Sequence, residues 1–568
     1  MAISGNSGGP EKWSSRTFVW QILRGRWFML FASTLITSAA SPMFGSYSAE
    51  IMSSLGYNQT TLNLLSFFKD VGVNAGIFAG VINEFAPPWL GLSIGAVLNF
   101  SGYFLIWLSV SKKISAPRVW HMCVYIFIAS NSQPFINTAA VVTCVKNFGG
   151  RTAVVSGLLT GFAGLSGAII TQLYHALACG NDSKSLIFLL IAGLPAAVSL
   201  AFSPTIRIIK VVRDGNEVKV LYRFLYVSLG LAIFLMVFTL LQNKLGFART
   251  DQFVITATVV VVMLLLLPVA VVLKEELNLL RMPQKQDLDR INVVALENLK
   301  LQEFSRENIS LAPERGQDHT ILQALVSIDM LLLFLATICG VGGTITTIDN
   351  LGEIGTSFGY PTKSITTYVS LVSTWNYLGR VISGFLSEHF LIKYEFPRPL
   401  MLTIIIVISS IAPLLIAFNV PNGLYVASVI IGFCFGAQWP LLFAIISELF
   451  GLKNYAVLYN FVTLASPIGS YLLKVRVTGY LYDTEAKKQL QASARAGERV
   501  NSCDGVECFR LAFIIIAVVT VFGAVVSLLL AVRTVKFYKE DVCKKLRREE
   551  ATALGTVEAG ETAAAGPK

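Results

Sequence analysis

The sequence has few of the residues from which enzyme active sites and metal sites are built. Only four histidines occur in 568 residues (His121, His175, His319 and His389), and they are scattered along the chain. The eight cysteines show no metal-ligand spacing. No cluster of catalytic groups is visible, so we expect a protein that is not an enzyme and that binds neither a metal nor another cofactor.

Charged residues are also scarce. They make up 14% of the chain, whereas 54% is hydrophobic and the mean hydropathy is +0.64. Soluble domains are typically about 45–50% apolar, and a run of about 20 apolar residues spans a bilayer core. The net charge of +11 falls in connecting loops, which favours contact with the lipid bilayer over nucleic-acid binding. The composition therefore predicts an all-α multipass membrane protein.

Hydropathy predicts 14 transmembrane helices in groups of six, two and six. The first six spans are residues 27–48, 60–82, 90–110, 119–143, 152–175 and 185–205. Two extra spans follow at 221–242 and 253–273, and the last six are 321–348, 365–387, 399–418, 423–446, 454–474 and 510–533. The predicted organisation is a cytosolic N-terminus (1–26), a first half (27–206), the extra helices with a polar cytosolic loop (207–320), a second half (321–534) and a disordered cytosolic tail (535–568).

The two halves are copies of each other. A shift of 303 residues aligns eight identities between the stretches Leu30–Glu84 and Leu333–Glu388. After one inserted residue, Gly80 and Glu84 align with Gly384 and Glu388, so each half carries G-x-x-x-E after its second span. Two like halves related as parallel repeats are what a transporter with one central solute path requires.

Basic residues predict the orientation. Lys and Arg gather before the first span, in the loop after the sixth and after the last, which places both termini in the cytosol. Lys112, Lys113 and Arg118 fall on the opposite side and are the main argument against this topology. A misplaced third or fourth helix would be the simplest fault.

Two features lie on the predicted outer side. Asn58 and Asn181 each begin a sequon and could be glycosylated there. Cys503 and Cys508 are separated by four residues in the long loop before the last span. An oxidising compartment would allow a local disulfide between them. Free thiols are one alternative, and Cys179, also on the predicted outer side, could compete as a partner.

The second span carries a Lys69-Asp70 pair near mid-membrane, where charged side chains face a partner or water. We interpret this pair, with Gly80, Glu84, Gly384 and Glu388, as candidates for conformational coupling and gating; structural pairing is the alternative. Successive helix positions differ by about 100°, so Lys69 and Asp70 are expected to point in different directions. Gly157, Gly161 and Gly164 on the fifth span form a small-residue face, interpreted as close helix packing.

The candidate solute-binding groups lie on the spans expected to line the path, which are the first and fourth of each half. The second and fifth spans of each half are expected to gate between the halves. Amides in a membrane helix beside a proline exceed what packing needs. The set comprises Asn131, Gln133, Asn137, Thr344, Gln438 and Trp439.

With duplicated six-helix halves and two glycine–acid motifs, the chain resembles the major facilitator superfamily. Phe85 and His389 replace the basic residue that usually follows the acid of that motif. More closely, the chain is similar to the plant nodulin-like proteins, which include the nuclear-fusion-defective-like group. The similarity is carried by Arg26-Trp27-Phe28, Gly56-Tyr57-Asn58-Gln59, Phe68-Lys69-Asp70-Val71-Gly72 and Asp349-Asn350-Leu351-Gly352. The resemblance implies a major facilitator fold with two extra central helices and a carrier function, but no particular solute.

Arg380, four residues before Gly384, resembles the arginine with which monocarboxylate and oxalate carriers bind a carboxylate. Asn376 stands where monocarboxylate carriers have an aspartate, which puts proton coupling at this helix in doubt. Glu388 or carbonyls of a neighbouring helix could hold Arg380 instead. The leading interpretation is a carrier of a small polar solute, an organic anion, with a possible coupling proton.

Three further points stay open at this stage. A sugar or other neutral solute is the alternative cargo, and a non-transporting membrane sensor or scaffold is the alternative function. The oligomeric state is open, and a monomer is plausible. The membrane could be the plasma membrane or an internal one such as that of the vacuole.

Overall fold

The computed structural model describes residues 22–39, 47–57, 59–115, 117–177, 186–209, 217–245, 250–281, 313–496, 503 and 505–547. Every regular element in these ranges is a helix. Ten helices there are long and apolar enough to cross a membrane. The prediction of a multipass all-α membrane protein is confirmed, and the count of 14 helices stays a prediction. The sequons at Asn58 and Asn181 lie outside the described ranges.

The first half and the extra pair are built from consecutive helices. They are α2 (Arg26–Ala39), α3 (Ser48–Leu55), α4 (Gln59–Asn74), α5 (Ile77–Phe85), α6 (Pro88–Val110), α7 (Val119–Asn137), η2 (Thr138–Val142), α8 (Thr143–Asn147), α9 (Thr152–Leu177), α10 (Leu186–Phe202), η3 (Ser203–Thr205), α11 (Glu217–Leu245) and α12 (Thr250–Arg281). The predicted second span is thus two helices, α4 and α5, which meet at Ala75 and Gly76. Pro134 lies inside α7, and the π-turn η2 follows it, as is common where a proline interrupts helical hydrogen bonding.

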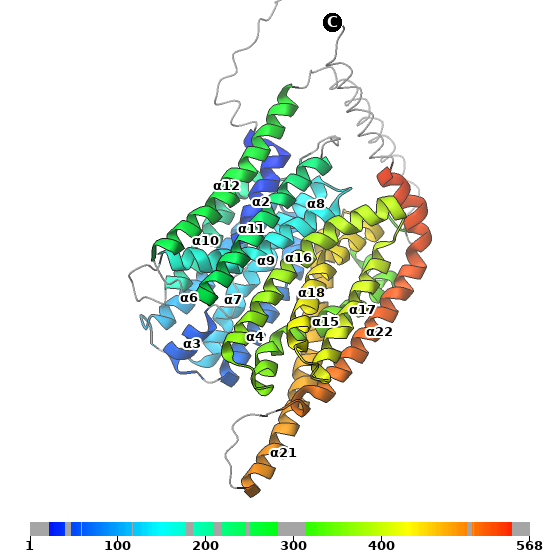
Figure 1. The fold of residues 1–568 in the computed structure, drawn as a ribbon. Helices are drawn as coiled ribbons and strands as arrows, with labels where there is room; N and C mark the ends of the chain where they lie inside the picture. Colours follow the sequence, from blue (N-terminus) through cyan, green and yellow to red (C-terminus); the bar gives the residue numbers. More distant parts are fainter. Residues whose placement is uncertain are drawn as a thin grey trace, which may run out of the picture.

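The second half has one long helix for most predicted spans. It contains α14 (Ile321–Val326), α15 (Ile328–Ser357), α16 (Thr362–Tyr394), α17 (Arg398–Ala417), α18 (Gly423–Phe450), α19 (Tyr455–Thr463), α20 (Ala465–Ser470), η4 (Tyr471–Gly479), α21 (Tyr480–Ala496), α22 (Glu507–Phe537) and η5 (Tyr538–Val542). The helical path from α19 through α21 runs well past the predicted span 454–474, and Figure 1 shows α21 projecting from the bundle.

The two ends of the helix bundle are distinguished by the helices that lie there. We call the end with α3 and α21 the outer end, and the opposite end, with α8 and the C-terminal end of α22, the inner end (Figure 1). The Tyr57 hydroxyl donates to the Pro117 carbonyl at 3.3 Å, which places the turn containing Lys112 and Lys113 at the outer end with α3. The helices on either side of these lysines therefore run in the predicted directions relative to α3, and the side of the membrane that this end faces stays a prediction.

The halves meet chiefly at two interfaces, and the extra helices cover one of them. First-half α5 packs against second-half α19, and first-half α9 packs against second-half α16 and α18. Helix α12 lies beside α2 and α9, while α11 touches α9, α12 and α16. The Tyr377 hydroxyl of α16 donates to Ser228 of α11 at 2.8 Å. The α9–α16 interface therefore has the extra helices along its flank.

Candidate functional site

The glycines of the repeated motif lie at the two interfaces between the halves. A Cβ on Gly80 would come within 2.7 Å of the Ala456 carbonyl oxygen in α19, and one on Gly384 within 2.5 Å of the Ala153 carbonyl oxygen in α9. Ala153 and Ala456 are themselves 303 residues apart. The two contacts are therefore equivalent under the duplication, and each needs glycine because the neighbouring backbone leaves no room for a side chain. Their gating role stays a prediction.

The small-residue face of α9 belongs to the same interface. A Cβ on Gly157 would lie 2.7 Å from the Arg380 carbonyl oxygen, and one on Gly161 would lie 2.6 Å from Cγ2 of Val381. The predicted close packing is therefore present, and it joins one half to the other.

The two motif acids have different partners. Glu84 pairs with Lys146 of its own half at 2.8 Å. Glu388 accepts from Arg151 of the first half and from Arg398 of the second, each at 2.6 Å. The Arg151–Glu388 pair therefore ties the halves together at the inner end, beside the Gly384 contact.

Arg398 is the centre of a buried network that sequence reasoning missed. Its side chain is 1% exposed, and it donates to Glu388, to Ser387 at 2.6 Å and to Glu448 at 2.7 Å. The Tyr538 hydroxyl also donates to Glu448 at 2.9 Å. The sequence signal for this network was the presence of charged residues at the ends of otherwise apolar spans. Such charges, if buried, need partners.

Lys69 and Asp70 form an ion pair with 2.7 Å between Nζ and Oδ1. The expectation that they point in different directions is therefore wrong, because the flexible lysine stem reaches across one helical step. Asp70 is also an electrostatic neighbour of Asp349 and Lys474 of the second half, which pair at 2.9 Å. Lys474 is also an electrostatic neighbour of Glu353. We call these five residues the outer charge cluster; the four in ion pairs have 20–30% of their side-chain surface exposed.

Arg380 lies between the halves with neutral partners. Its Nε donates to Asn376 Oδ1 at 3.0 Å, and Nη1 approaches the Thr160 carbonyl oxygen of the first half at 3.4 Å. Tyr459 of α19 is an electrostatic neighbour. No carboxylate in the described part of the chain pairs with this guanidinium, and Glu388, the acid offered from sequence, is held by Arg151 and Arg398.

The predicted solute-binding groups divide into two sets. Asn131 donates to the carbonyls of Gly72 and Ala75 at 3.1 and 3.2 Å, where α4 gives way to α5. Thr344 donates to carbonyls of its own helix. These two side chains therefore have structural partners, and Gln133 is buried.

The second set has buried polar atoms without a partner among the described residues. They are Oδ1 of Asn137, Oε1 of Gln438 and Nε1 of Trp439. Leaving a buried donor or acceptor unpaired costs about 1–3 kcal/mol, so a ligand supplying partners would bind favourably here. The Trp439 ring lies 5.7 Å from that of Phe443, which in turn lies 4.2 Å from the ring of Tyr459, the neighbour of Arg380. Trp439 therefore lies in the same region as Arg380.

Asn460 is a further polar residue at the interface that sequence reasoning missed. It faces Gly76, and its Nδ2 donates to Thr138 of the first half at 2.9 Å. Under the duplication Asn460 corresponds to Gly157 and Arg380 corresponds to Gly76. Gly76 thus faces the Asn460 side chain of α19, whereas Gly157 faces the backbone carbonyl of Arg380 in α16.

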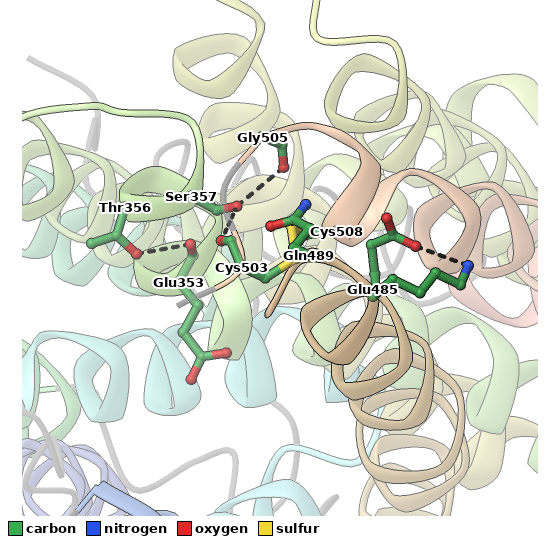
Figure 2. The surroundings of a disulfide bond; sticks show 9 residues. Glu353, Thr356, Ser357, Glu485, Gln489, Cys503, Gly505 and Cys508 are labelled. Atoms are coloured by element: carbon green, nitrogen blue, oxygen red, sulfur yellow. Dashed lines mark hydrogen bonds and ion pairs between the residues drawn. A yellow bond between two sulfur atoms is a disulfide. The ribbon is translucent and has the colours of Figure 1, made fainter. Parts of the chain in front are cut away.

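At the outer end, Cys503 and Cys508 form a disulfide (Figure 2). The Ser357 hydroxyl donates to the Cys503 carbonyl at 3.0 Å, and the Gly505 amide donates to the Ser357 carbonyl at 2.9 Å. The bridged turn therefore holds the outer end of α15 beside the start of α22.

The arrangement of helices is that of the major facilitator superfamily. The structure superposes on a double-tryptophan variant of XylE with a TM-score of 0.53 at 12% identity, covering 94% of this chain and 99% of that one. XylE is described as a proton:xylose symporter of that superfamily. At this identity the likeness establishes the fold alone.

Sequence comparison identifies the family within that fold. Residues 26–273 match the nodulin-like family, and residues 318–540 match the C-terminal domain of NFD4. The chain therefore belongs to the nodulin-like proteins. It is 26% identical over 538 residues to Protein NUCLEAR FUSION DEFECTIVE 4 of Arabidopsis thaliana, covering 90% of this chain and 89% of that protein. A shorter match, 26% over 208 residues, is to Probable transporter MCH1 of Yarrowia lipolytica, covering 34% and 40% of the two chains.

Proposed function

We propose that this protein carries a small organic anion across a membrane by alternating access. The observation that carries the proposal is Arg380, a guanidinium between the two halves whose described partners are an amide and a carbonyl. A charge held within a membrane span calls for an anion, and a substrate carboxylate would supply one. The transporter fold and the relative named a probable transporter support the class of function.

Chemistry at the site suits such a solute. The planar guanidinium of Arg380 can bind a carboxylate with two parallel hydrogen bonds. The unpaired groups on Asn137, Gln438 and Trp439 would then fix the remainder of the molecule. A neutral sugar is the second candidate, because those three groups are all uncharged and include an indole ring.

The inner end of the bundle is closed and the outer end is partly exposed, which is the arrangement expected of a carrier that opens to one side at a time. Gly80, Gly384 and the Arg151–Glu388 pair close the halves at the inner end, whereas the outer charge cluster keeps part of its surface exposed. With both termini in the cytosol, as the loop charges favour, the solute would enter from outside. A coupling proton would act at Asp70 or Asp349.

The test is Arg380→Lys, assayed by uptake into liposomes from a panel of labelled mono- and dicarboxylates and neutral hexoses. Lysine keeps the charge but loses the planar fork, so we expect the affinity for the transported carboxylate to fall about 10- to 100-fold. Arg510→Lys, at an exposed position of α22, is the matched control and should leave uptake unchanged. Normal affinity in a folded Arg380→Lys protein would refute the carboxylate role and leave the sugar ahead.

Asp70→Asn tests the coupling role of the outer charge cluster. Removing this carboxylate breaks the ion pair with Lys69 and changes the balance of charge facing Asp349 and Lys474. We expect reduced uptake with unchanged protein yield and unchanged stabilisation by bound solute, because a coupling group acts on the conformational step. Asp483→Asn, on the exposed face of α21, is the control. Loss of folded Asp70→Asn protein in detergent would instead show a structural role.

A further inference from the structure

A cavity of about 370 Å³ lies at the inner end, away from Arg380. Three elements wall it: the start of α9, the start of α11 and the end of α16. Its lining residues are Arg151, Val154, Val218, Leu221, Tyr222, Phe385, Glu388, His389, Ile392 and Lys393. Because α11 is one of the two helices outside the duplicated halves, the cavity has a wall that the two six-helix halves alone would lack.

The lining has a charged side and an apolar side. Arg151 and Glu388 are buried at its floor, with 10% and 7% of their side chains exposed, while His389 and Lys393 are exposed at its rim. Arg151 and Lys393 bring two positive charges to the lining and Glu388 brings one negative charge, so the positive charge around the cavity exceeds the negative charge. The apolar wall comes from α11 and from Phe385, whose ring lies 5.0 Å from that of Tyr222. An occupant should therefore be anionic at one end and apolar at the other.

The surface next to the cavity is apolar and exposed. Tyr226 of α11 is 65% exposed, and Ile382 and Leu386 of α16 are each 38% exposed. On a membrane-spanning protein such side chains face lipid. The rim lysine lies at the helix end, at the depth where lipid head groups meet basic side chains. The cavity thus opens where a head group and its acyl chains would lie together.

We propose that this cavity binds an acidic phospholipid of the inner leaflet. Its phosphate contacts Lys393 and Arg151, and its acyl chains follow the exposed apolar surface of α11 and α16. The head group competes with Glu388 for Arg151, and Glu388 keeps Arg398, so no carboxylate is left unpaired. Binding therefore weakens the ion pair that joins the halves at the inner end. The binding itself does not depend on which solute the protein carries.

Lipid titration of the purified full-length protein in neutral detergent tests the proposal. We expect phosphatidylserine to raise the unfolding temperature and to remain bound in native mass spectrometry, and phosphatidylcholine to do so much less. Lys393→Gln should weaken phosphatidylserine binding about fivefold, the contribution of one basic residue near an acidic lipid. Lys536→Gln, an exposed cation of α22 off the cavity, should change nothing.

A second variant distinguishes lipid binding in the cavity from non-specific attraction to surface charge. Val218→Trp fills the space while keeping every charge, so phosphatidylserine should no longer be retained although the protein stays folded. Equal stabilisation by phosphatidylcholine, or full retention in both cavity variants, would overturn the proposal. Stabilisation by inorganic phosphate or glycerophosphoserine as strong as that by the lipid would show a site for a soluble anion and overturn the lipid assignment.

Discussion

Gly384→Leu is expected to reduce solute uptake to about a tenth or less of the normal rate. Even a Cβ at this position would lie 2.5 Å from the Ala153 carbonyl oxygen and 3.2 Å from the Gly157 Cα. Those atoms are backbone, so they cannot rotate away, and α16 must separate from α9. Overpacking of this kind costs about 1–3 kcal/mol. If this cost falls only on the conformation that is closed at the inner end, the population of that conformation relative to the alternative falls about 5- to 150-fold.

Gly384→Leu should be compared with a substitution at the equivalent glycine of the first half and with a control glycine that has no close neighbour. Gly80→Leu meets the Ala456 backbone in the same way at the other interface and should have a similar effect. Gly193→Leu in α10 meets nothing within 4 Å of its Cβ and should transport normally. Uptake and unfolding temperature would be measured together, to separate a shifted equilibrium from loss of fold. Normal uptake by folded Gly384→Leu would show that close contact at this glycine is dispensable.

Arg398→Leu is expected to destabilise the protein by about 3–5 kcal/mol, the range for breaking a buried ion pair by removing one partner. The side chain is 1% exposed and serves both Glu388 and Glu448. Without it, Glu448 keeps only the Tyr538 hydroxyl, and a buried carboxylate lacks a countercharge. Thermal unfolding in detergent should show a large fall in midpoint and in the yield of monodisperse protein.

A charge-balanced variant tests the cause. In Arg398→Met/Glu448→Gln both the cation and one carboxylate are gone, while Glu388 keeps Arg151, so much of the lost stability should return. Arg547→Leu removes an arginine from an ion pair that is 46% and 39% exposed, and exposed pairs contribute only about 0–1 kcal/mol. Equal instability of the single and double variants would mean that packing around Arg398, and not the unpaired carboxylate, sets the loss.

Much of the architecture could be predicted because it depends on local hydropathy and on a repeat within the sequence. Apolar runs predicted the multipass class, and the shift of 303 residues predicted two like halves. The same shift relates Ala153 to Ala456, and so the equivalence of the Gly80 and Gly384 contacts follows from the duplication. The second span of each half packs against the fifth span of the other for this reason, and the gating role of these spans stays a prediction. The count of 14 spans was less secure, because short or polar spans carry a weak hydropathy signal.

Side-chain partners were predicted poorly. Lys69 and Asp70 were expected to diverge, because helical geometry describes where Cβ atoms point and ignores how far a lysine stem reaches. Asn131 and Thr344 bond to nearby carbonyls, and their role as solute ligands stays a prediction. The unpaired atoms of Gln438 and Trp439 emerge only once their neighbours are placed. Composition cannot distinguish a polar group that has a partner from one that lacks it.

By itself, the sequence determined that this is a membrane protein of two duplicated helical halves, with a glycine and an acid placed alike in each. Hydropathy and the internal repeat are properties of the amino-acid sequence and can be recognised without a structure. Only the tertiary structure decided which acid joins the halves: Glu388 meets Arg151 from 237 residues away, whereas Glu84 meets Lys146 within its own half. Ion pairing falls off over a few ångströms, so it depends on where helix ends come to rest, which spacing along the chain does not encode.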